Sequence, residues 1–235
     1  KDIVNRFGSQ TVHDGVSMTL NENEILGLVG GSGSGKSVLL RTILGLHRPN
    51  EGEVLIDGHV LSSEERQNTQ KKWGVLFQNG ALFSSLTVLD NIALPMREHT
   101  DLSRQEMEDL ARMKLGMVGL KQDAADKFPS QLSGGMVKRA ALARALALVP
   151  EVLLLDEPCS VLDPVATSRV EELIHELGED YTLVVVTHSM QQAARISDYT
   201  AFFDQGELVE FDETDVVFTK PSDPRTEDYI TGRFG

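Results

Sequence analysis

The glycine-rich segment from Gly30 to Ser37 constrains the fold of this chain more than any other feature. It has the sequence Gly-Gly-Ser-Gly-Ser-Gly-Lys-Ser, follows an apolar run at residues 24–29, and leads into residues 36–46, which are apolar on most faces. Such an arrangement is typical of the strand–loop–helix unit of α/β proteins. Residues 152–156 and 183–187 are further short apolar runs, as expected for parallel strands covered on both faces. The sequence therefore predicts an α/β fold with a mostly parallel sheet.

Length and composition narrow the class of protein. A chain of 235 residues can bury a full core and is expected to form one large domain or a core with a subdomain. Its longest apolar runs are much shorter than the roughly 20 residues of a membrane-spanning helix. The formal charge of −14 argues against nucleic acid or anionic lipid as the main contact surface. The single cysteine, Cys159, excludes an intrachain disulfide and fits a reducing compartment, so the expected compartment is the cytoplasm.

The segment 30–37 also carries a chemical prediction. It fits the pattern G-x-x-x-x-G-K-[ST], whose glycines let consecutive backbone N–H groups surround phosphate oxygens. Lys36 is predicted to reach the β- and γ-phosphates of a nucleotide, and the Ser37 hydroxyl to bind Mg²⁺. The alternative is a glycine-rich turn without a ligand, and the flanking strand and helix argue against it. The predicted phosphate-binding residues are Gly30, Gly31, Ser32, Gly33, Ser34, Gly35, Lys36, Ser37 and Val38.

A second predicted strand ends in acidic side chains. Residues 152–156 are Val-Leu-Leu-Leu-Asp, and Glu157 follows. Ligands of open α/β sheets bind at the carboxyl ends of the strands, so we expect Asp156 to enter the Mg²⁺ shell. The adjacent Glu157 is placed to orient or deprotonate an attacking water. An acidic turn without a catalytic role would be the better interpretation only if no phosphate loop accompanied it.

A second helix begins with an anion-binding pattern. Ser133 is a typical N-cap residue, and Gly134 and Gly135 lie in the first turn of a helix predicted over residues 133–148. Glycine costs roughly 1 kcal/mol against alanine inside a helix, so these glycines favour close approach of an anion to the backbone. The turn contains no metal ligand or lysine of its own. We therefore predict that these residues complete the γ-phosphate site of a second copy, in a head-to-tail dimer with ATP at the joint.

Two further helix starts carry capping signals. Ser103 with Glu106 forms a capping-box pattern ahead of an amphipathic helix. Asp163, followed by a proline, forms an N-cap and first-turn pair before a helix that extends to Leu177.

The tail, residues 219–235, contains two prolines and is predicted to be an extended arm outside the core. It also contains Tyr229, Ile230 and Phe234, which are poor choices for a solvated end. We therefore expect the arm to pack on a neighbouring subunit.

Together these motifs resemble the ATP-binding cassette (ABC) ATPases. The matching set is the phosphate loop, Gln78 after a strand at 74–77, Leu-Ser-Gly-Gly at 132–135, Leu-Leu-Leu-Asp-Glu-Pro at 153–158, Ser-Val-Leu-Asp at 160–163, and His188. The order and spacing match over nearly the whole chain, from about Phe7 to Phe211. The resemblance implies a P-loop NTPase core with a mostly parallel sheet, an N-terminal antiparallel β subdomain and a helical subdomain at about 84–150. These parts would form a single ATPase domain over 1–218, followed by the C-terminal arm at 219–235.

The resemblance implies roles for three residues around the nucleotide. Phe7 would stack on adenine, and His188 would contact the γ-phosphate. Gln78 would contact Mg²⁺ and the attacking water, and it would also report to a membrane partner. Each has a structural alternative, because Phe7 could be a core residue, Gln78 a polar loop residue, and His188 a buried histidine at a strand end.

The resemblance also implies how two copies share their sites. Ser133 and Gly135 would bind the γ-phosphate held by the other copy, with Glu157 as the catalytic base. Asp163 would couple the two sites across the dimer, in addition to capping its helix.

Two positions depart from the usual pattern of the family. Val38 stands where threonine is common and cannot donate a hydroxyl to the α-phosphate, and Met136 stands where glutamine is common. Neither departure removes a catalytic group.

Within ABC transporters, residues 76–83, 94–100 and 132–136 resemble the ATPase of bacterial phospholipid transport complexes, the maintenance-of-lipid-asymmetry (Mla) system. That resemblance implies ATP-driven phospholipid transport between the inner and outer membranes, at the cytoplasmic face of the bacterial inner membrane. The implied partners are a second copy of the chain, an integral-membrane permease that docks on residues 78–100, a small STAS-domain subunit, and a lipid-binding protein of the mammalian-cell-entry type. No nucleic-acid partner is expected.

Two other functions share the same motifs. The ATPase of a polar amino-acid importer has every catalytic motif named above. The ABC ATPases of translation, DNA repair and chromosome maintenance usually have two cassettes in one chain, or coiled-coil or zinc-bearing insertions. This chain has one cassette, one cysteine and no basic patch, which favours the cassette of a multi-subunit transporter.

Overall fold

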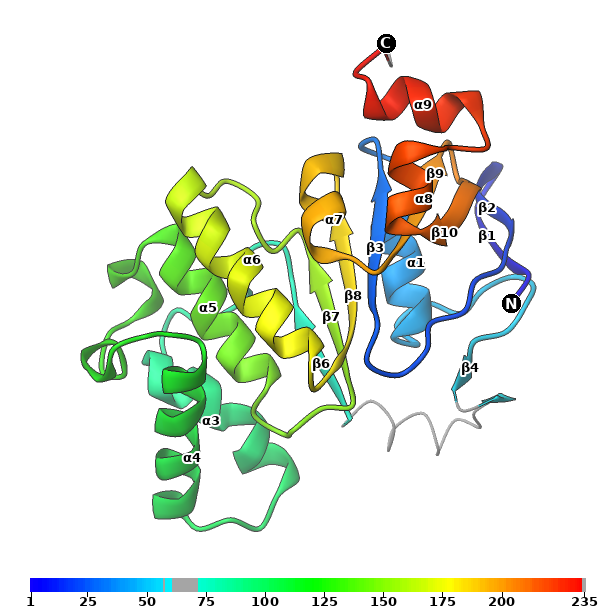
Figure 1. The fold of residues 1–235 in the computed structure, drawn as a ribbon. Coiled ribbons are helices and arrows are strands. Elements are labelled where there is room, and N and C mark those ends of the chain that lie inside the picture. The colour runs from blue at the N-terminus through cyan, green and yellow to red at the C-terminus, as the bar shows by residue number, and fades with distance from the viewer. Residues whose placement is uncertain (57, 61–71, 234–235) are drawn as a thin grey trace. The chain divides into compact units, whose positions relative to one another are not determined.

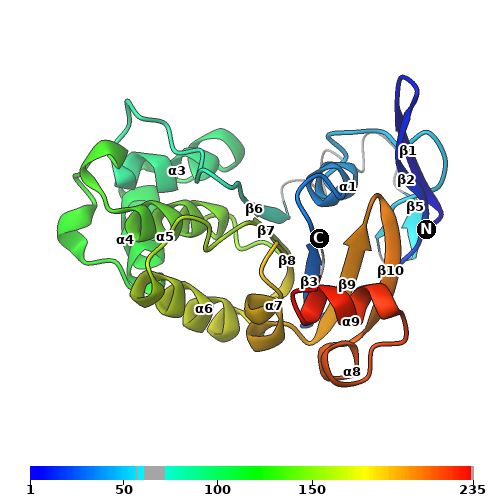
Figure 2. The ribbon, with the colours of Figure 1, turned by 90° about the horizontal axis from the view of Figure 1, so that it is seen from above.

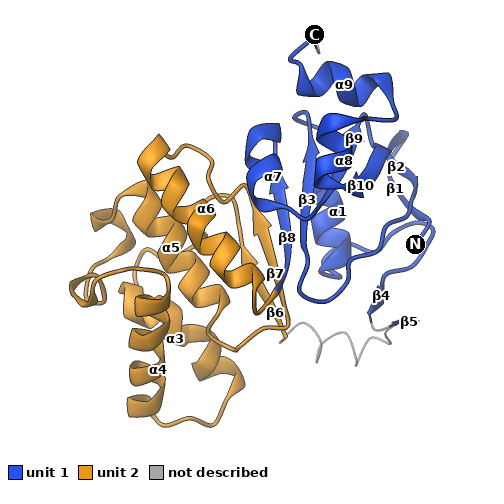
Figure 3. Ribbon diagram, viewed as in Figure 1, with its two compact units in different colours: residues 1–70, 182–235 blue, residues 71–181 orange. Residues whose placement is uncertain are grey.

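The computed structural model describes residues 1–56, 58–60 and 72–233. The chain divides into two units, which Figure 3 shows in separate colours. Unit 1 comprises residues 1–70 and 182–235, and unit 2 comprises the intervening residues 71–181.

Four strands of unit 1 lie side by side in the order β10-β9-β3-β8. Their bounds are β3 (Ile25–Gly30), β8 (Thr182–Thr187), β9 (Tyr199–Asp204) and β10 (Glu207–Glu213). Strand β3 pairs in parallel with β8 and with β9, whereas β9 and β10 form an antiparallel hairpin. Every residue of β3 and β8 is buried, because both faces of a central parallel strand are covered.

Helices cover both sides of these strands. Figure 2 shows α1 on one side and α7, α8 and α9 on the other. The bounds are α1 (Lys36–Ile43), α7 (Met190–Ile196), α8 (Thr214–Thr219) and α9 (Pro224–Ile230). Two antiparallel pairs complete unit 1: β1 (Ile3–Phe7) with β2 (Gln10–Val16), and β4 (Leu55–Ile56) with β5 (His59–Val60).

The C-terminal tail differs from the sequence-based prediction. Residues Pro224–Ile230 form helix α9, shown in red in Figure 1, so the prediction of an extended arm is wrong for them. Tyr229 and Ile230 pack against buried side chains of unit 1. These buried side chains are Val29, Met190, Ala193 and Phe202. A helix this short is marginal on its own, so these contacts stabilise it. Phe234 lies outside the described residues.

Unit 2 contains the parallel strand pair β6 (Trp73–Leu76) and β7 (Val152–Asp156). Its helices are α3 (Val88–His99), α4 (Arg104–Met117), α5 (Gly134–Ala145) and α6 (Pro164–Gly178). Helix α5 contacts β6, α3, α4 and α6, which makes it the central helix of the unit.

The predicted helix caps of unit 2 are confirmed. Ser103 and Glu106 form a reciprocal capping box at the start of α4. The side chains of Ser133 and Asp163 accept backbone hydrogen bonds at the starts of α5 and α6. These bonds satisfy N–H groups that the first turn of a helix leaves without partners.

The fold-class prediction is confirmed, because the chain is an α/β protein with mostly parallel strand pairing, N-terminal antiparallel strands and a helical part. Helices α3, α4 and α5 fall within the range 84–150 assigned to the helical subdomain, while the domain boundaries stay a prediction. In the described part of the chain, every helix is too short or too polar to cross a bilayer.

Candidate functional site

The predicted phosphate loop lies in unit 1, between the end of β3 and the start of α1. The Lys36 side chain is buried. Its Nζ donates hydrogen bonds to Gly30 O at 2.7 Å, Gly31 O at 2.8 Å and Ser34 Oγ at 3.2 Å. These three contacts hold the ammonium group inside the loop.

Two of the loop glycines are required because other residues of unit 1 approach them closely. Gly30 has φ 148°, and a Cβ atom there would lie 2.1 Å from Phe203 O. Gly35 has φ 99°, and a Cβ atom there would lie 2.6 Å from His13 Nε2. Only glycine combines these conformations with this lack of space.

The rest of the loop fits an anion with several oxygens. Ser32, Gly33 and Ser37 are exposed. Within the described residues, no internal backbone hydrogen bond uses the N–H groups of Ser32 or Gly33. Donors of this kind beside a helix start are a typical phosphate site. Val38 follows, half-buried, and contributes no hydroxyl group.

Unit 1 also carries Phe7, the predicted adenine-stacking residue, and His188, predicted to contact the γ-phosphate. Phe7 is 47% exposed, so it is not a core residue. Its ring stacks on His47 with 4.8 Å between centroids. His188 is exposed at the end of β8, and its backbone oxygen accepts a hydrogen bond from Tyr229 Oη at 3.3 Å. The sequence analysis did not single out His47 or Tyr229 for these contacts, since both partners are distant in sequence.

The acidic residues lie in unit 2. Asp156 ends β7 and is half-buried. Glu157 follows with φ 50°, in the left-handed region that side chains rarely adopt. Gln78 is exposed just beyond β6.

The described residues contain no group of three or more His, Cys, Asp or Glu side chains that could hold a metal ion. The predicted Mg²⁺ ligands Ser37, Gln78 and Asp156 include one carboxylate. Ser37 lies in unit 1 and the other two in unit 2, so their joint role as Mg²⁺ ligands stays a prediction.

At the start of α5, the predicted anion-binding residues differ in exposure. Ser133 and Gly134 are exposed, whereas Gly135 is buried. A Cβ atom at Gly135 would lie 3.0 Å from Ala166 Cβ in α6, so packing inside unit 2 also favours glycine there. Sequence reasoning missed this contact, because it depends on how α5 and α6 pack.

Lys138, also on α5, was not predicted from the sequence to belong to the site. Its side chain is buried, and burial lowers its pKa, whereas the nearby Cys159, Glu157 and Asp156 act in the opposite direction. Its local sequence carries no distinguishing signal, because Arg139 directly follows Lys138 on the same helix.

The structure places the predicted site residues in two sets, one in each unit. Unit 1 carries Phe7, residues 30–38 and His188; unit 2 carries Gln78, Ser133, Gly134, Gly135, Asp156, Glu157 and Asp163.

Several solved structures are similar to this chain. The dimeric ATP-binding cassette MJ0796 bound to ADP and Pi is 32% identical, with a TM-score of 0.82, over 91% of this chain and 97% of that one. A second dimeric structure of MJ0796, a bacterial ABC transporter cassette, is 33% identical with a TM-score of 0.83 over the same shares. CbiO1 from Clostridium perfringens, part of the ABC transporter complex cbiONQ, shares the fold, with 24% identity and a TM-score of 0.85 over 99% of this chain and 94% of that one.

A family model described as "ABC transporter" matches residues 13–160, which is more than half of the chain. The matched segment contains the phosphate loop, the start of α5, and the acidic end of β7. The chain belongs to the ABC transporter family.

Proposed function

We propose that this chain binds and hydrolyses ATP as a subunit of a transporter that moves phospholipid between the inner and outer membranes. The observation that carries the ATP assignment is the loop of unit 1, where a buried Lys36 is held beside exposed backbone N–H groups. In this proposal the loop binds the phosphates, Phe7 stacks on the adenine, and His188 contacts the γ-phosphate.

The hydrolytic step is assigned to unit 2. Glu157 accepts a proton from the attacking water, which Gln78 orients. Ser37, Gln78 and Asp156 would hold Mg²⁺, which would neutralise charge on the phosphates.

A second copy of the chain completes each site. Ser133 and Gly134 are exposed at the start of α5. Val161, in the segment that leads to Asp163, is 100% exposed. An apolar side chain so exposed suits burial against a second copy, and both MJ0796 structures are dimeric. Binding of two ATP molecules closes this dimer, and hydrolysis reopens it.

The permease is proposed to dock on the segment after β6. Phe77 and Phe83 are 39% and 54% exposed. The Asn91 side chain fixes the loop, because Oδ1 accepts from Phe83 N at 2.7 Å and Nδ2 donates to Phe83 O at 3.1 Å. A rigid loop that presents aromatic side chains suits a protein interface.

The lipid assignment rests on the resemblance of residues 76–83, 94–100 and 132–136 to the Mla ATPase. It includes a small STAS-domain subunit and a mammalian-cell-entry protein in the same complex, at the cytoplasmic face of the inner membrane. Detergent extraction of the tagged chain, followed by mass spectrometry of co-purifying proteins and lipids, tests it. We expect a permease, phospholipid and the two accessory proteins to co-purify. A permease with an amino-acid receptor would instead assign amino acids as the substrate.

A pair of variants tests the docking segment in the same purification. Phe83→Asp should release the permease and leave ATP binding intact. Val149→Asp is the matched control, because Val149 is 67% exposed and its φ of 51° suits aspartate. Retention of the permease by Phe83→Asp would contradict the docking assignment.

The catalytic assignments have their own test. Glu157→Gln should give a closed, ATP-bound dimer with little turnover, and wild-type turnover would refute its role as base. Ser133→Arg should abolish hydrolysis while leaving ATP binding to the isolated chain nearly intact, because Ser133 serves the other copy. Loss of binding by the monomer would refute that reasoning.

A further inference from the structure

Lys138, on α5, is hydrogen-bonded to two other segments of unit 2, the loop at Gln78 and the turn at Glu157. Its Nζ donates hydrogen bonds to the backbone oxygen of Gln78, to Glu157 O at 2.7 Å and to Ser160 Oγ at 3.2 Å. Three acceptors match the three N–H bonds of an ammonium group. A buried charge is unfavourable unless its hydrogen bonds are satisfied, so the arrangement ties these backbone segments to one atom of α5.

Both segments that Lys138 reaches contain left-handed residues. Glu157 has φ 50°, and Ala81, in the loop that follows Gln78, also has φ 50°. Such conformations persist only where the surroundings hold them. The Glu157 carbonyl is held by Lys138 at 2.7 Å and by Ser160 Oγ at 3.0 Å.

A second cation of α5 holds the same loop farther along. Arg144 Nη1 donates to Ala81 O at 2.6 Å, and Nη2 donates to Gly80 O at 2.9 Å. A Cβ atom at Gly80 would lie 3.0 Å from Val137 Cγ1, so the loop backbone lies directly on α5. Arg144 reaches this loop, whereas Lys138 reaches both the loop and the Glu157 turn.

We propose that Lys138 is a positioning residue for ATP hydrolysis, which holds the Gln78 loop and the Glu157 turn in register with the helix that begins at Ser133. The inference rests on the proposed function, because its catalytic consequence requires that Gln78 and Glu157 act in hydrolysis. Lys138 would act through these two segments, because its three hydrogen bonds go to protein oxygens. Movement of α5 would be passed through this one ammonium group to both segments.

The variants separate the hydrogen bonds from the burial of a lysine. Lys138→Met keeps an unbranched apolar stem and removes all three donors. Lys138→Gln keeps two N–H donors without the charge, and Arg144→Met releases the Gln78 loop only. Lys114→Met is the matched control, since Lys114 is also buried in unit 2 and no hydrogen bond among the described residues joins it to Gln78 or Glu157.

The full-length chain, assayed in the complex with which it co-purifies, supplies the kinetic readout. Lys138→Met should lower kcat roughly 10- to 100-fold, the range expected when catalytic groups are misplaced by about 1 Å. KM and the affinity for a fluorescent ATP analogue should stay within about twofold of wild type, since ground-state binding is not removed. Lys138→Gln should be intermediate, and Lys114→Met should hydrolyse ATP at the wild-type rate.

Hydrogen exchange tests the tether without any nucleotide. Gly80 N–H and Ser160 N–H are bonded to Phe77 O and Glu157 O. Both amides should exchange faster in Lys138→Met, and only Gly80 N–H should do so in Arg144→Met. A wild-type protein that does not hydrolyse ATP would refute the proposed function. Hydrogen exchange would still show whether Lys138 holds the Gln78 loop and the Glu157 turn. Wild-type kcat in Lys138→Met, unchanged exchange at both amides, or an equal loss of kcat in Lys114→Met would overturn the inference.

Discussion

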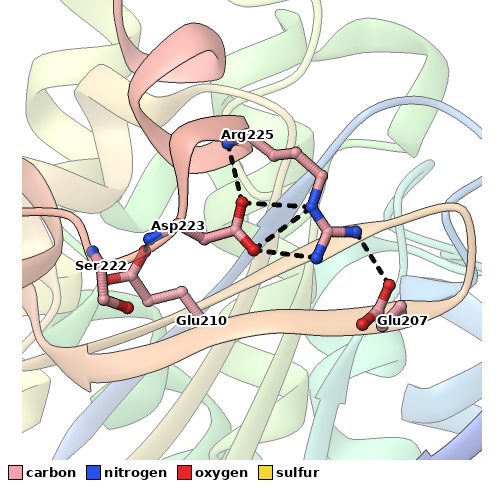
Figure 4. Close-up of polar contacts among 5 residues, drawn as sticks. All are labelled: Glu207, Glu210, Ser222, Asp223 and Arg225. Atoms are coloured by element: carbon pink, nitrogen blue, oxygen red, sulfur yellow. Dashed lines mark hydrogen bonds and ion pairs between the residues drawn. The ribbon is translucent and has the colours of Figure 1, made fainter.

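The C-terminal helix α9 is held by two kinds of contact, and they predict different mutational effects. Figure 4 shows the polar contacts, in which Arg225 pairs with Asp223 at 2.9 Å and with Glu207 at 2.8 Å. These two carboxylates raise the pKa of Arg225 above its usual range. The pair with Glu207 is largely exposed, and exposed ion pairs contribute little because water and salt screen them.

The apolar contact is expected to dominate. The ring of Tyr229 packs on Phe202 with 4.9 Å between centroids, over the buried cluster of unit 1. Truncation of a fully buried aromatic side chain to alanine costs about 3–5 kcal/mol. Tyr229 is half-buried, so Tyr229→Ala should lower the free energy of unfolding by about half of that, ~2 kcal/mol.

Urea unfolding of the full chain measures the free energy of unfolding, and a thermal melt measures the melting temperature. The melting temperature of Tyr229→Ala should fall by about 4–8 °C for a chain of this size. Tyr229→Phe removes only the hydroxyl that donates to His188 O, so its loss should stay below about 1 kcal/mol. Asp228→Ala is the control, because Asp228 is exposed on the same helix. A larger loss in Arg225→Ala than in Tyr229→Ala would refute this reasoning and assign the stability of α9 to its ion pairs.

Three further predictions concern His13 and the two glycines at the start of α5. Burial lowers the pKa of His13, so the unfolded chain binds more protons and stability should fall as pH drops below about 6.5, by at most about 1.4 kcal/mol per pH unit. Urea unfolding of wild type and His13→Gln at about pH 7.5 and about pH 5.5 checks this. An equal change in the free energy of unfolding in both proteins between these two pH values would contradict it. Gly134→Ala should raise stability by about 0.5–1 kcal/mol, because its Cβ would meet only Leu162 at 3.4 Å, yet it should lower ATP hydrolysis. Gly135→Val should lower stability by about 1–3 kcal/mol, since the position faces Ala166 Cβ at 3.0 Å. Thermal melts compare the last two variants, and Gly134→Ala should have the higher melting temperature. A higher melting temperature for Gly135→Val would show that α5 and α6 separate easily.

Local sequence signals determined most secondary-structure elements. The apolar run that leads to Gly30 forms most of β3, and Lys36, near the end of the glycine-rich segment, begins α1. Ser103, Ser133 and Asp163 each cap the helix that was predicted to follow them. These signals work because a cap, a turn or an apolar run acts on residues within a few positions of itself.

The motifs of the candidate site were predicted from the sequence. The residues that pack around these motifs were not. The phosphate loop needs Gly30 and Gly35 partly because Phe203 O and His13 approach them closely, which no spacing rule reveals. The tail was predicted to be extended because it contains two prolines, Pro221 and Pro224. Its helix is stabilised by Tyr229 and Ile230 on a cluster drawn from distant strands and helices.

Tertiary structure alone decided the position of Lys138. The sequence by itself determined that a lysine follows the Leu-Ser-Gly-Gly motif on a mostly apolar helix. Its acceptors are oxygens of residues 60, 19 and 22 positions away, two of them backbone carbonyls. Every residue has a backbone carbonyl, so the choice of these partners carries no sequence signal and arises only when the helix and the two segments pack together.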